Sequence, residues 1–220
     1  MTVLRLGGEP LSVVGRARVY VCGVTPYDVT HLGHAATFVW VDAAERVLRR
    51  LGAQVEVCRN VTDVDDVLFE AAQRQGAQYE RFAAVQQFHF DRDMEALNVR
   101  RPAFEPRAHT FIEPVIALAQ TLLVRGAAYT SGGGVYLPGA AVAERAGVDR
   151  ETALALLREN GGHVDDPAKR DPLDQAVWQP SSGDEPAWPS PWGPGRPGWH
   201  AECTAMALST YGNGVDLHAG

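Results

Sequence analysis

The sequence is poor in cysteine and has no long apolar segment. Its three cysteines, Cys22, Cys58 and Cys203, are too few for the disulfide framework of a small secreted protein. No two of them form a C-x-x-C pair, which argues against a zinc ribbon or a thioredoxin motif. No run of about 18 apolar residues predicts a membrane span, and the N-terminus lacks the apolar core of a secretory signal. We therefore expect a cytoplasmic protein.

An excess of basic charge is also absent. The formal net charge of −7 argues against a protein that binds nucleic acid through a broad basic face, although it is compatible with a local basic patch. Hydrophobic residues make up 45% and charged residues 21% of the 220 residues, which is ordinary for a globular protein. The length is sufficient for one α/β domain with its own core.

Apolar periodicity predicts a strand–helix–strand unit near the start of the chain. Residues 18–22 predict a buried strand, residues 35–51 an amphipathic helix that Gly52 ends, and residues 54–58 a second strand followed by a loop from Asn60. A unit of this length predicts a parallel strand pair. Ligands in such folds bind at the carboxyl ends of the strands, where residues 22–25 and 60–62 fall.

The remainder predicts further helices and one long loop. Helices are expected over 77–97, 111–124 and 149–159, with Asp149 as a cap, and a glycine-rich hairpin or loop over 126–136. Residues 165–198 predict a long ordered loop that packs through its tryptophans. Residues 215–220 look like the end of a strand that enters a loop, so we expect a fragment of a longer domain.

Two local patterns point to chemistry. His31 and His34 stand where a strand should pass into a helix, and helix N-termini attract phosphate through free N–H groups and the macrodipole. A histidine pair alone would more often cap the helix, but this position favours binding of a triphosphate. Asp63, Asp65 and Asp66 are compatible with a magnesium site or with a cap on the following helix, and we favour the cap.

Five blocks of the chain resemble the catalytic domains of class I aminoacyl-tRNA synthetases, in particular the cysteine-specific branch. HLGH at 31–34 is similar to the HIGH signature of the class, and four blocks are similar to cysteine-specific signatures: CGVT at 22–25, NVTDVDD at 60–66, SPWG at 190–193 and GWHAEC at 198–203. The resemblance implies a Rossmann (HUP-type) parallel sheet with a helical insertion, incomplete at the C-terminus. It implies a first Rossmann half over about 18–75, an insertion over about 76–165, and a return loop with the start of the second half over about 166–220.

Two branches share these blocks: cysteinyl-tRNA synthetase, and the mycothiol-pathway ligase that joins cysteine to the amine of glucosaminyl-inositol. TPYD at 25–28, GHAAT at 33–37, DDVLFE at 65–70 and DPLD at 171–174 resemble the ligase. EPRA at 105–108 and His218 resemble the synthetase, and ENGGHV at 159–164 matches a block of the ligase only in part. We favour the ligase and keep the synthetase as the alternative, with a non-catalytic fragment that binds cysteine or nucleotide as a third possibility.

The resemblance implies a zinc ion that holds the thiolate of the substrate cysteine. Cys22 and Cys203 would be two ligands, and further ligands are expected beyond Gly220. Zinc prefers thiolate over a hydroxyl, which would discriminate cysteine from serine. Cys58 matches no ligand position and is expected to be a small buried apolar residue.

The resemblance also assigns the nucleotide site. His31 and His34 would be catalytic, binding the phosphates of ATP, which brings Mg²⁺, and stabilising the pentavalent α-phosphate. The residues expected to contact ATP or the adenylate are Cys22, Gly23, Val24, Thr25, Thr37, Asn60, Val61, Thr62 and Trp199. L-cysteine and ATP would give cysteinyl-adenylate and pyrophosphate, and the amine of glucosaminyl-inositol would then displace AMP. In the alternative, a ribose hydroxyl of tRNA attacks instead.

Overall fold

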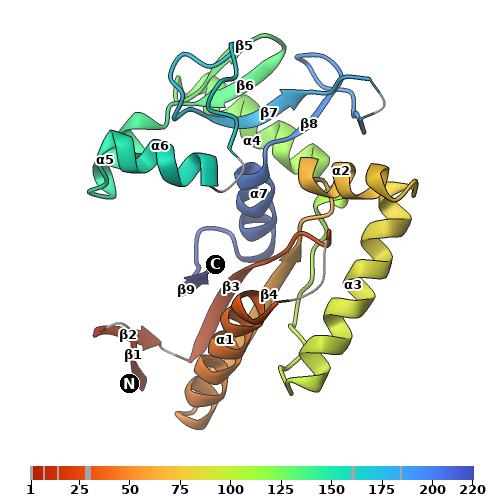
Figure 1. The fold of residues 1–220 in the computed structure, drawn as a ribbon. Coiled ribbons are helices and arrows are strands. Elements are labelled where there is room, and N and C mark those ends of the chain that lie inside the picture. Colours follow the sequence, from red (N-terminus) through yellow and green to blue (C-terminus); the bar gives the residue numbers. More distant parts are fainter. Residues whose placement is uncertain (1, 7, 14, 28–30, 160–161, 184) are drawn as a thin grey trace. The chain divides into compact units, whose positions relative to one another are not determined.

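The computed structural model describes residues 2–6, 8–13, 15–27, 31–159, 162–183 and 185–220. Residues 28, 30, 160 and 161 of the motifs above lie outside these ranges. The chain forms two compact units, Met1–Phe111 with Cys203–Gly220, and Ile112–Glu202, and each is described by itself (Figure 1). Among the described residues, no helix combines the length and the apolar character needed to cross a bilayer.

A parallel sheet forms the centre of the first unit. Strand β3 (Arg16–Val24) lies between β4 (Gln54–Val61) and β9 (Leu217–Ala219), and both neighbours run parallel to it. Helix α1 (Leu32–Arg50) connects β3 to β4, which confirms the predicted strand–helix–strand unit. Gly52 follows α1 with a φ of 91°, a conformation that favours glycine, and ends the helix as expected.

Strand β4 extends further than the sequence predicts. The prediction that a loop begins at Asn60 is wrong, because Asn60 and Val61 still belong to the strand. The cause is tertiary: residues 104–107 lie beside β4, where the N–H of Arg59 donates to the carbonyl of Phe104 (3.0 Å) and that of Val61 to Pro106 (2.9 Å). This added pairing keeps the backbone extended until Thr62.

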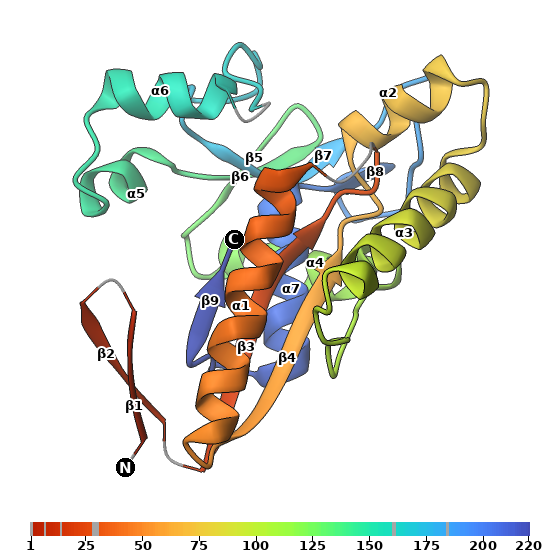
Figure 2. The ribbon, with the colours of Figure 1, turned by 60° about the horizontal axis from the view of Figure 1, so that its bottom comes forward.

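Side chains of β3 alternate between the two faces of the sheet. Val19 and Val21 are buried in the apolar cluster that includes Phe38 of α1, and Figure 2 shows α1 lying along β3 and β4. Tyr20 and Cys22 have the opposite parity and therefore belong to the other face. This division separates the apolar side chains that β3 directs toward α1 from the face that carries the Tyr20 hydroxyl and the Cys22 sulfur.

Helix α7 (Trp199–Tyr211), which the sequence analysis did not predict, meets the second face with its later residues. Cys58, the register partner of Tyr20, lies 3.8 Å from the hydroxyl of Thr210, and the Tyr211 hydroxyl donates to the carbonyl of Glu56 (2.9 Å). Cys58 is fully buried, as expected. The segment from Cys203 onward thus returns to the sheet that the first part of the chain builds.

Helices α2 (Asp66–Arg74) and α3 (Tyr79–Ala96) complete the first unit, together with the hairpin β1 (Thr2–Leu6) and β2 (Glu9–Val13) and the short η1 (Ala108–Thr110). Asp65 caps α2 by accepting a hydrogen bond from the N–H of Val67 (3.1 Å), which confirms the predicted cap. The helix expected over 77–97 is α3, and Phe90 in α3 packs edge-on against Phe38 of α1.

An antiparallel sheet of order β5-β6-β7-β8 forms the second unit. Its strands are β5 (Tyr129–Ser131), β6 (Gly134–Leu137), β7 (Gln175–Pro180) and β8 (Gly195–Pro197). Its helices are α4 (Ile112–Val124), α5 (Ala140–Arg145) and α6 (Arg150–Glu159). The predicted hairpin is β5–β6, and Asp149 caps α6 through the N–H of Thr152 (2.9 Å), as expected.

The prediction of one long loop over 165–198 is wrong, because the segment contains β7 and β8. Both strands are short and include proline, so the local sequence carries only a weak strand signal. Pairing of Trp178 with Pro197 across the two strands, and full burial of Trp178, stabilise them instead. The expectation that this segment packs through tryptophan is confirmed for Trp178.

Substitution of Gly23 by Ala tests the close approach of β3 and β4. A Cβ atom at Gly23 would lie 1.5 Å from the carbonyl oxygen of Asn60, so the strand ends must separate. We expect Gly23→Ala to lower the free energy of unfolding by more than about 2 kcal/mol, as overpacking against backbone does. Urea unfolding followed by circular dichroism measures this.

Gly33→Ala is the matched control, because a Cβ there meets only the His31 ring, at 3.0 Å, inside a helix that favours Ala. We expect its stability to stay within about 1 kcal/mol of the wild type. Equal stability of the Gly23→Ala protein and the wild type would contradict the close approach.

Candidate active site

The N-terminus of α1 carries the predicted catalytic histidines. His31 is the N-cap, and its Nδ1 accepts hydrogen bonds from the backbone N–H groups of Gly33 (3.1 Å) and His34 (3.4 Å). The rings of His31 and His34 are stacked with their centroids 3.9 Å apart. The cap is therefore confirmed, and it uses the same N–H groups that an anion would bind. The phosphate-binding role of the two histidines stays a prediction.

The environment of His34 favours its neutral form. Burial, followed by the electrostatic interaction with His31, lowers the pKa of His34 below its ordinary value. A neutral imidazole still offers one N–H donor to a phosphate oxygen. Thr37, one helical turn further along α1, is half-buried on the same side of the helix.

The carboxyl ends of β3 and β4 join in one hydrogen-bond network. The N–H of Gly23 donates to Oδ1 of Asn60 (2.9 Å), and Nδ2 of Asn60 donates to the hydroxyl of Thr62 (2.9 Å). The N–H of Thr62 donates to the carbonyl of Val24 (3.1 Å), and the hydroxyl of Thr25 donates to Asp65 (3.1 Å). Predicted contact residues from two separate motifs therefore form a single rim on the edge where α/β folds bind ligands.

Val61 does not offer its side chain to that rim, and Trp199 lies in the other unit. Val61 is 1% exposed and belongs to the core, so only its backbone is available there. Trp199 belongs to the second unit, at the start of α7, where it is 45% exposed and lies 4.9 Å from the ring of His200. Burial lowers the pKa of His200. The role of Trp199 stays a prediction.

Cys22, at the end of β3, lies beside Cys203 and His218. Its Sγ is 3.3 Å from Nε2 of His218. The hydrogen bond with Cys203, followed by that with His218, lowers the pKa of Cys22 to about 6 although burial opposes the shift. On the same face, burial and the neighbouring thiols raise the pKa of Tyr20. The structure thus brings the two predicted zinc ligands together and adds an imidazole to them.

The described residues do not form a complete metal site. Thiolate and imidazole are the donors that zinc prefers, so the chemistry of the Cys22, Cys203 and His218 side chains fits the ion. Within the described ranges, however, no group of three or more His, Cys, Asp or Glu side chains is arranged to hold a metal ion. The acidic run at Asp63–Asp66 is among the residues without such an arrangement. The helix cap described above is observed there instead of a magnesium site.

The sequence analysis missed a carboxylate–imidazole pair at the same edge. Asp63 accepts hydrogen bonds from both the backbone N–H and the ring Nδ1 of His109, at 3.0 and 2.6 Å. No local pattern links the two residues. The signal that would have revealed them is the pairing of residues 104–107 with β4, which places both at its carboxyl end.

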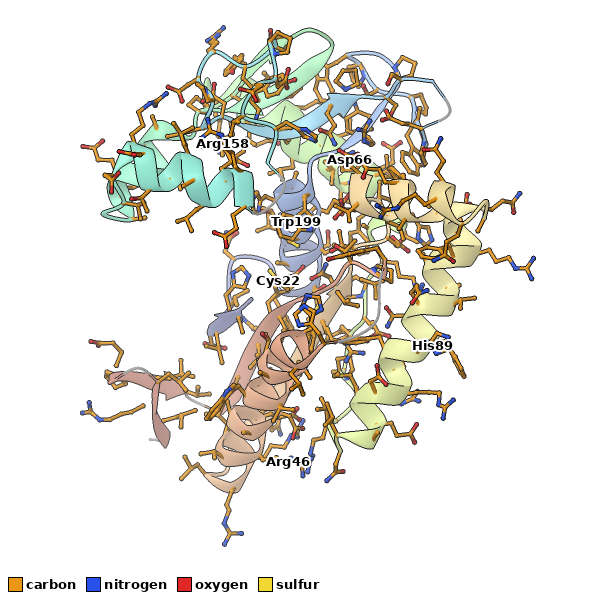
Figure 3. The ribbon with its side chains drawn as sticks, viewed as in Figure 1. Cys22, Arg46, Asp66, His89, Arg158 and Trp199 are labelled. Carbon is orange, nitrogen blue, oxygen red and sulfur yellow. The ribbon has the colours of Figure 1, made fainter. Side chains whose placement is uncertain are left out.

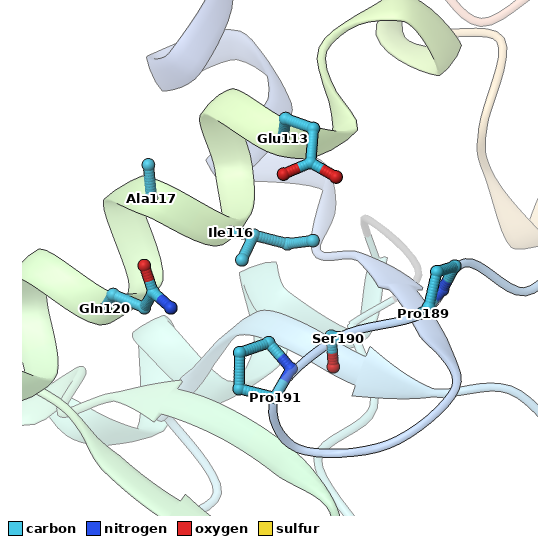
Figure 4. A pocket seen from close by; sticks show the side chains of 7 residues that line it. All are labelled: Glu113, Ile116, Ala117, Gln120, Pro189, Ser190 and Pro191. Carbon is cyan, nitrogen blue, oxygen red and sulfur yellow. The ribbon is translucent and has the colours of Figure 1, made fainter.

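A shallow pocket of about 370 Å³ lies within the second unit (Figure 4). Its lining comes from α4 and from the loop that contains Ser190, and it includes none of the residues predicted to bind ATP or zinc. The Ser190 hydroxyl donates to the carbonyl of Gly193 (2.6 Å), so this serine stabilises its own turn. The pocket residues are Glu113, Ile116, Ala117, Gln120, Pro189, Ser190 and Pro191.

Comparison with protein families places the chain in a known class. Residues 10–220 match the model of the family described as tRNA synthetases class I (C) catalytic domain. The chain therefore belongs to this family, which confirms the expected class I synthetase fold with its parallel sheet. The solved methionyl-tRNA synthetase of Mycobacterium tuberculosis in complex with methionyl-adenylate supports the fold, with a TM-score of 0.65 at 16% identity over 91% of this chain and 47% of that one.

Curated relatives narrow the similarity to one branch. The L-cysteine:1D-myo-inositol 2-amino-2-deoxy-alpha-D-glucopyranoside ligase of Mycolicibacterium gilvum is 45% identical over 96% of this chain and 49% of the ligase. The ligase of the same name from Mycobacterium tuberculosis is 41% identical over 96% of this chain and 53% of the ligase. The chain thus spans about half the length of these relatives.

The pKa of His34 provides a test of the histidine pair. We expect His34 to titrate below 6.5, its ordinary value, because burial and the electrostatic interaction with His31 both oppose the cation. The unfolded chain then binds more protons, so the free energy of unfolding falls as the pH drops from 6.5 through the lower folded-state pKa. His31→Gln removes the second cause and raises the pKa of His34 part of the way. NMR titration of the ring protons measures both values, and a His34 pKa at or above 6.5 would contradict the geometry.

Proposed function

We propose that this protein activates L-cysteine with ATP to cysteinyl-adenylate and transfers the cysteinyl group to the amine of glucosaminyl-inositol. The convergence of Cys22 and Cys203 near the carboxyl end of β3, the strand that α1 and its histidines His31 and His34 follow, is the observation that carries the proposal. Relatives named as the corresponding ligase, at 41–45% identity, support the choice of acceptor. The use of ATP supports a cytoplasmic location.

The first step joins the cysteine carboxylate to the α-phosphate of ATP, which brings Mg²⁺. His31 and His34 bind and orient the phosphates, and the N–H groups at the start of α1 stabilise the negative charge that develops. The Asn60–Thr62 rim and the backbone of Gly23 and Thr25 position the adenylate. Catalysis here is chiefly positioning and electrostatic stabilisation, with no covalent bond to the protein.

Cys22 and Cys203 would hold a zinc ion, with further ligands from outside the described residues. When bound, the ion would coordinate the thiolate of the substrate. The protein's own contribution is the thiol of Cys22, whose pKa is lowered by hydrogen bonds from its neighbours. Serine, with its harder and less acidic hydroxyl, would be excluded at this step.

A second candidate function is transfer of cysteine to tRNA. The description of the matched family as tRNA synthetases favours it, and so does the EPRA segment at 105–108. The first half-reaction is the same in both functions. The acceptor alone distinguishes them.

Acceptor-dependent AMP release tests the proposal in the full-length protein. We expect glucosaminyl-inositol, and not total tRNA, to stimulate AMP formation from ATP and cysteine. Stimulation by tRNA alone would establish the second candidate. If neither acceptor stimulates release, the protein is a cysteine- or nucleotide-binding domain without transfer activity.

Zinc content tests the cysteine site independently. We expect Cys22→Ser and Cys203→Ser each to lower zinc affinity by about tenfold or more and to weaken cysteine binding. Cys58→Ala is the matched control, because Cys58 is buried against Thr210 and should leave zinc binding unchanged. Atomic emission of the purified proteins measures the metal. Equal zinc in all three variants and the wild type would exclude this site.

A further inference from the structure

The buried carboxylate of Asp63 forms a pair with the exposed imidazole of His109. The side chain of Asp63 is 7% exposed, whereas that of His109 is 46% exposed. Oδ2 of Asp63 lies 2.6 Å from Nδ1 of His109, and Oδ1 accepts the backbone N–H of the same residue at 3.0 Å. Two contacts to one carboxylate fix both the position of His109 and the direction of its ring.

The backbone around His109 is held firmly beside the sheet. Residues 104–107 pair with β4 through the backbone hydrogen bonds described above. The buried guanidinium of Arg59 reinforces this pairing, because it forms ion pairs with Glu105 and with Asp91 of α3 (3.3 Å). Its CZ atom also lies 4.8 Å from the centroid of Phe90. His109 therefore directly follows a segment that is fixed to the sheet, and it does not lie in a free loop.

The pair lies on the rim where the adenylate is proposed to bind. Asp63 stands between Thr62, whose N–H donates to Val24, and Asp65, which accepts from Thr25. The loop that carries Asp63 is thus fixed on both sides to the carboxyl end of β3. His109 is attached to the same edge of the sheet by its contact with Asp63.

The hydrogen bond assigns the tautomer of the ring. An ionised carboxylate only accepts, so Nδ1 of His109 carries the proton and Nε2 keeps its lone pair. The guanidinium of Arg107 lies 4.0 Å from Oδ2 of Asp63. Tyr79 also faces Asp63, and its own pKa is raised to about 12 by burial, by Glu80 and by Asp63, so it stays neutral. An imidazole held in this way is a base whose cation the carboxylate stabilises.

We propose that His109 is the general base that accepts the proton of the attacking amine in the transfer step, and that Asp63 is its positioning residue. This inference rests on the proposed function. The amine nitrogen forms a bond to the carbonyl carbon of cysteinyl-adenylate, and the bond from that carbon to the phosphate oxygen breaks. AMP leaves with the electron pair, and the proton of the amine moves to Nε2 of His109. The first step, attack of a carboxylate on ATP, releases no such proton and does not need this base.

Separate assays of the two steps in the full-length enzyme test this assignment. Cysteine-dependent exchange of pyrophosphate into ATP reports adenylate formation without any acceptor, and single-turnover transfer to glucosaminyl-inositol reports the second step. We expect His109→Gln to lower transfer by about 100-fold and to keep exchange within about threefold of the wild type. Asp63→Asn should lower transfer by at least about tenfold, because the amide no longer selects the tautomer or stabilises the imidazolium.

Chemical rescue separates catalysis from structure. We expect added imidazole to restore transfer in His109→Ala by about tenfold, which a purely structural role would not allow. His89→Gln is the matched control, because His89 lies exposed on α3 (Figure 3) and should leave both assays unchanged.

Three results would overturn the assignment. Undiminished transfer in His109→Gln would exclude the base. Equal loss of exchange and transfer, together with a lowered melting temperature and no rescue by imidazole, would show that the pair is structural. Failure of the wild type to exchange pyrophosphate, or to use glucosaminyl-inositol, would remove the proposed function and this inference with it.

Discussion

The close approach of β3 and β4 at Gly23 and Asn60 is the constraint on which the candidate site depends. Since glycine has no side chain, the carbonyl of Asn60 occupies the space where a Cβ would stand. The buried Asn60 side chain then bonds both to Gly23 and to Thr62, so that its polar atoms are satisfied without water. A bulkier residue at position 23 would separate the ends of the two strands and break the hydrogen bonds of the rim that they share.

Three chemically different groups meet the carboxyl edge of this sheet. The N-terminus of α1 offers N–H groups and imidazoles, which suit phosphate. Cys22 belongs to the opposite face of β3, where Cys203 returns to it, and this face suits a soft metal ion or a thiol. Asp63, which follows β4, and His109, which is bound to it, offer a base. The alternation of side chains along β3 places the sulfur of Cys22 on the face opposite the apolar core under α1.

Much of the first unit could be predicted because its signals are local. Helical periodicity and Gly52 defined α1, and short-range capping defined the start of α2 at Asp65. In the second unit, the cap at Asp149 defined the start of α6 in the same way. Prediction was wrong where pairing with distant segments decides the structure. Strand β4 continues through Asn60 and Val61 only because residues 104–107 lie beside it, and β7 and β8 persist despite their prolines because they pair with each other.

The sequence by itself determined the family, the order of the motif blocks and the strand–helix–strand unit, because these depend on residue identity and short-range spacing. Only the tertiary structure decided which side chains meet. Cys22 and His218 are 196 residues apart, and Asp63 and His109 are 46 apart, with several elements in between. Their contacts follow from the parallel pairing of strands and the return of α7, which no local pattern encodes. For this reason a site residue such as Cys203 could be named from its motif, whereas the partner of Asp63 could not.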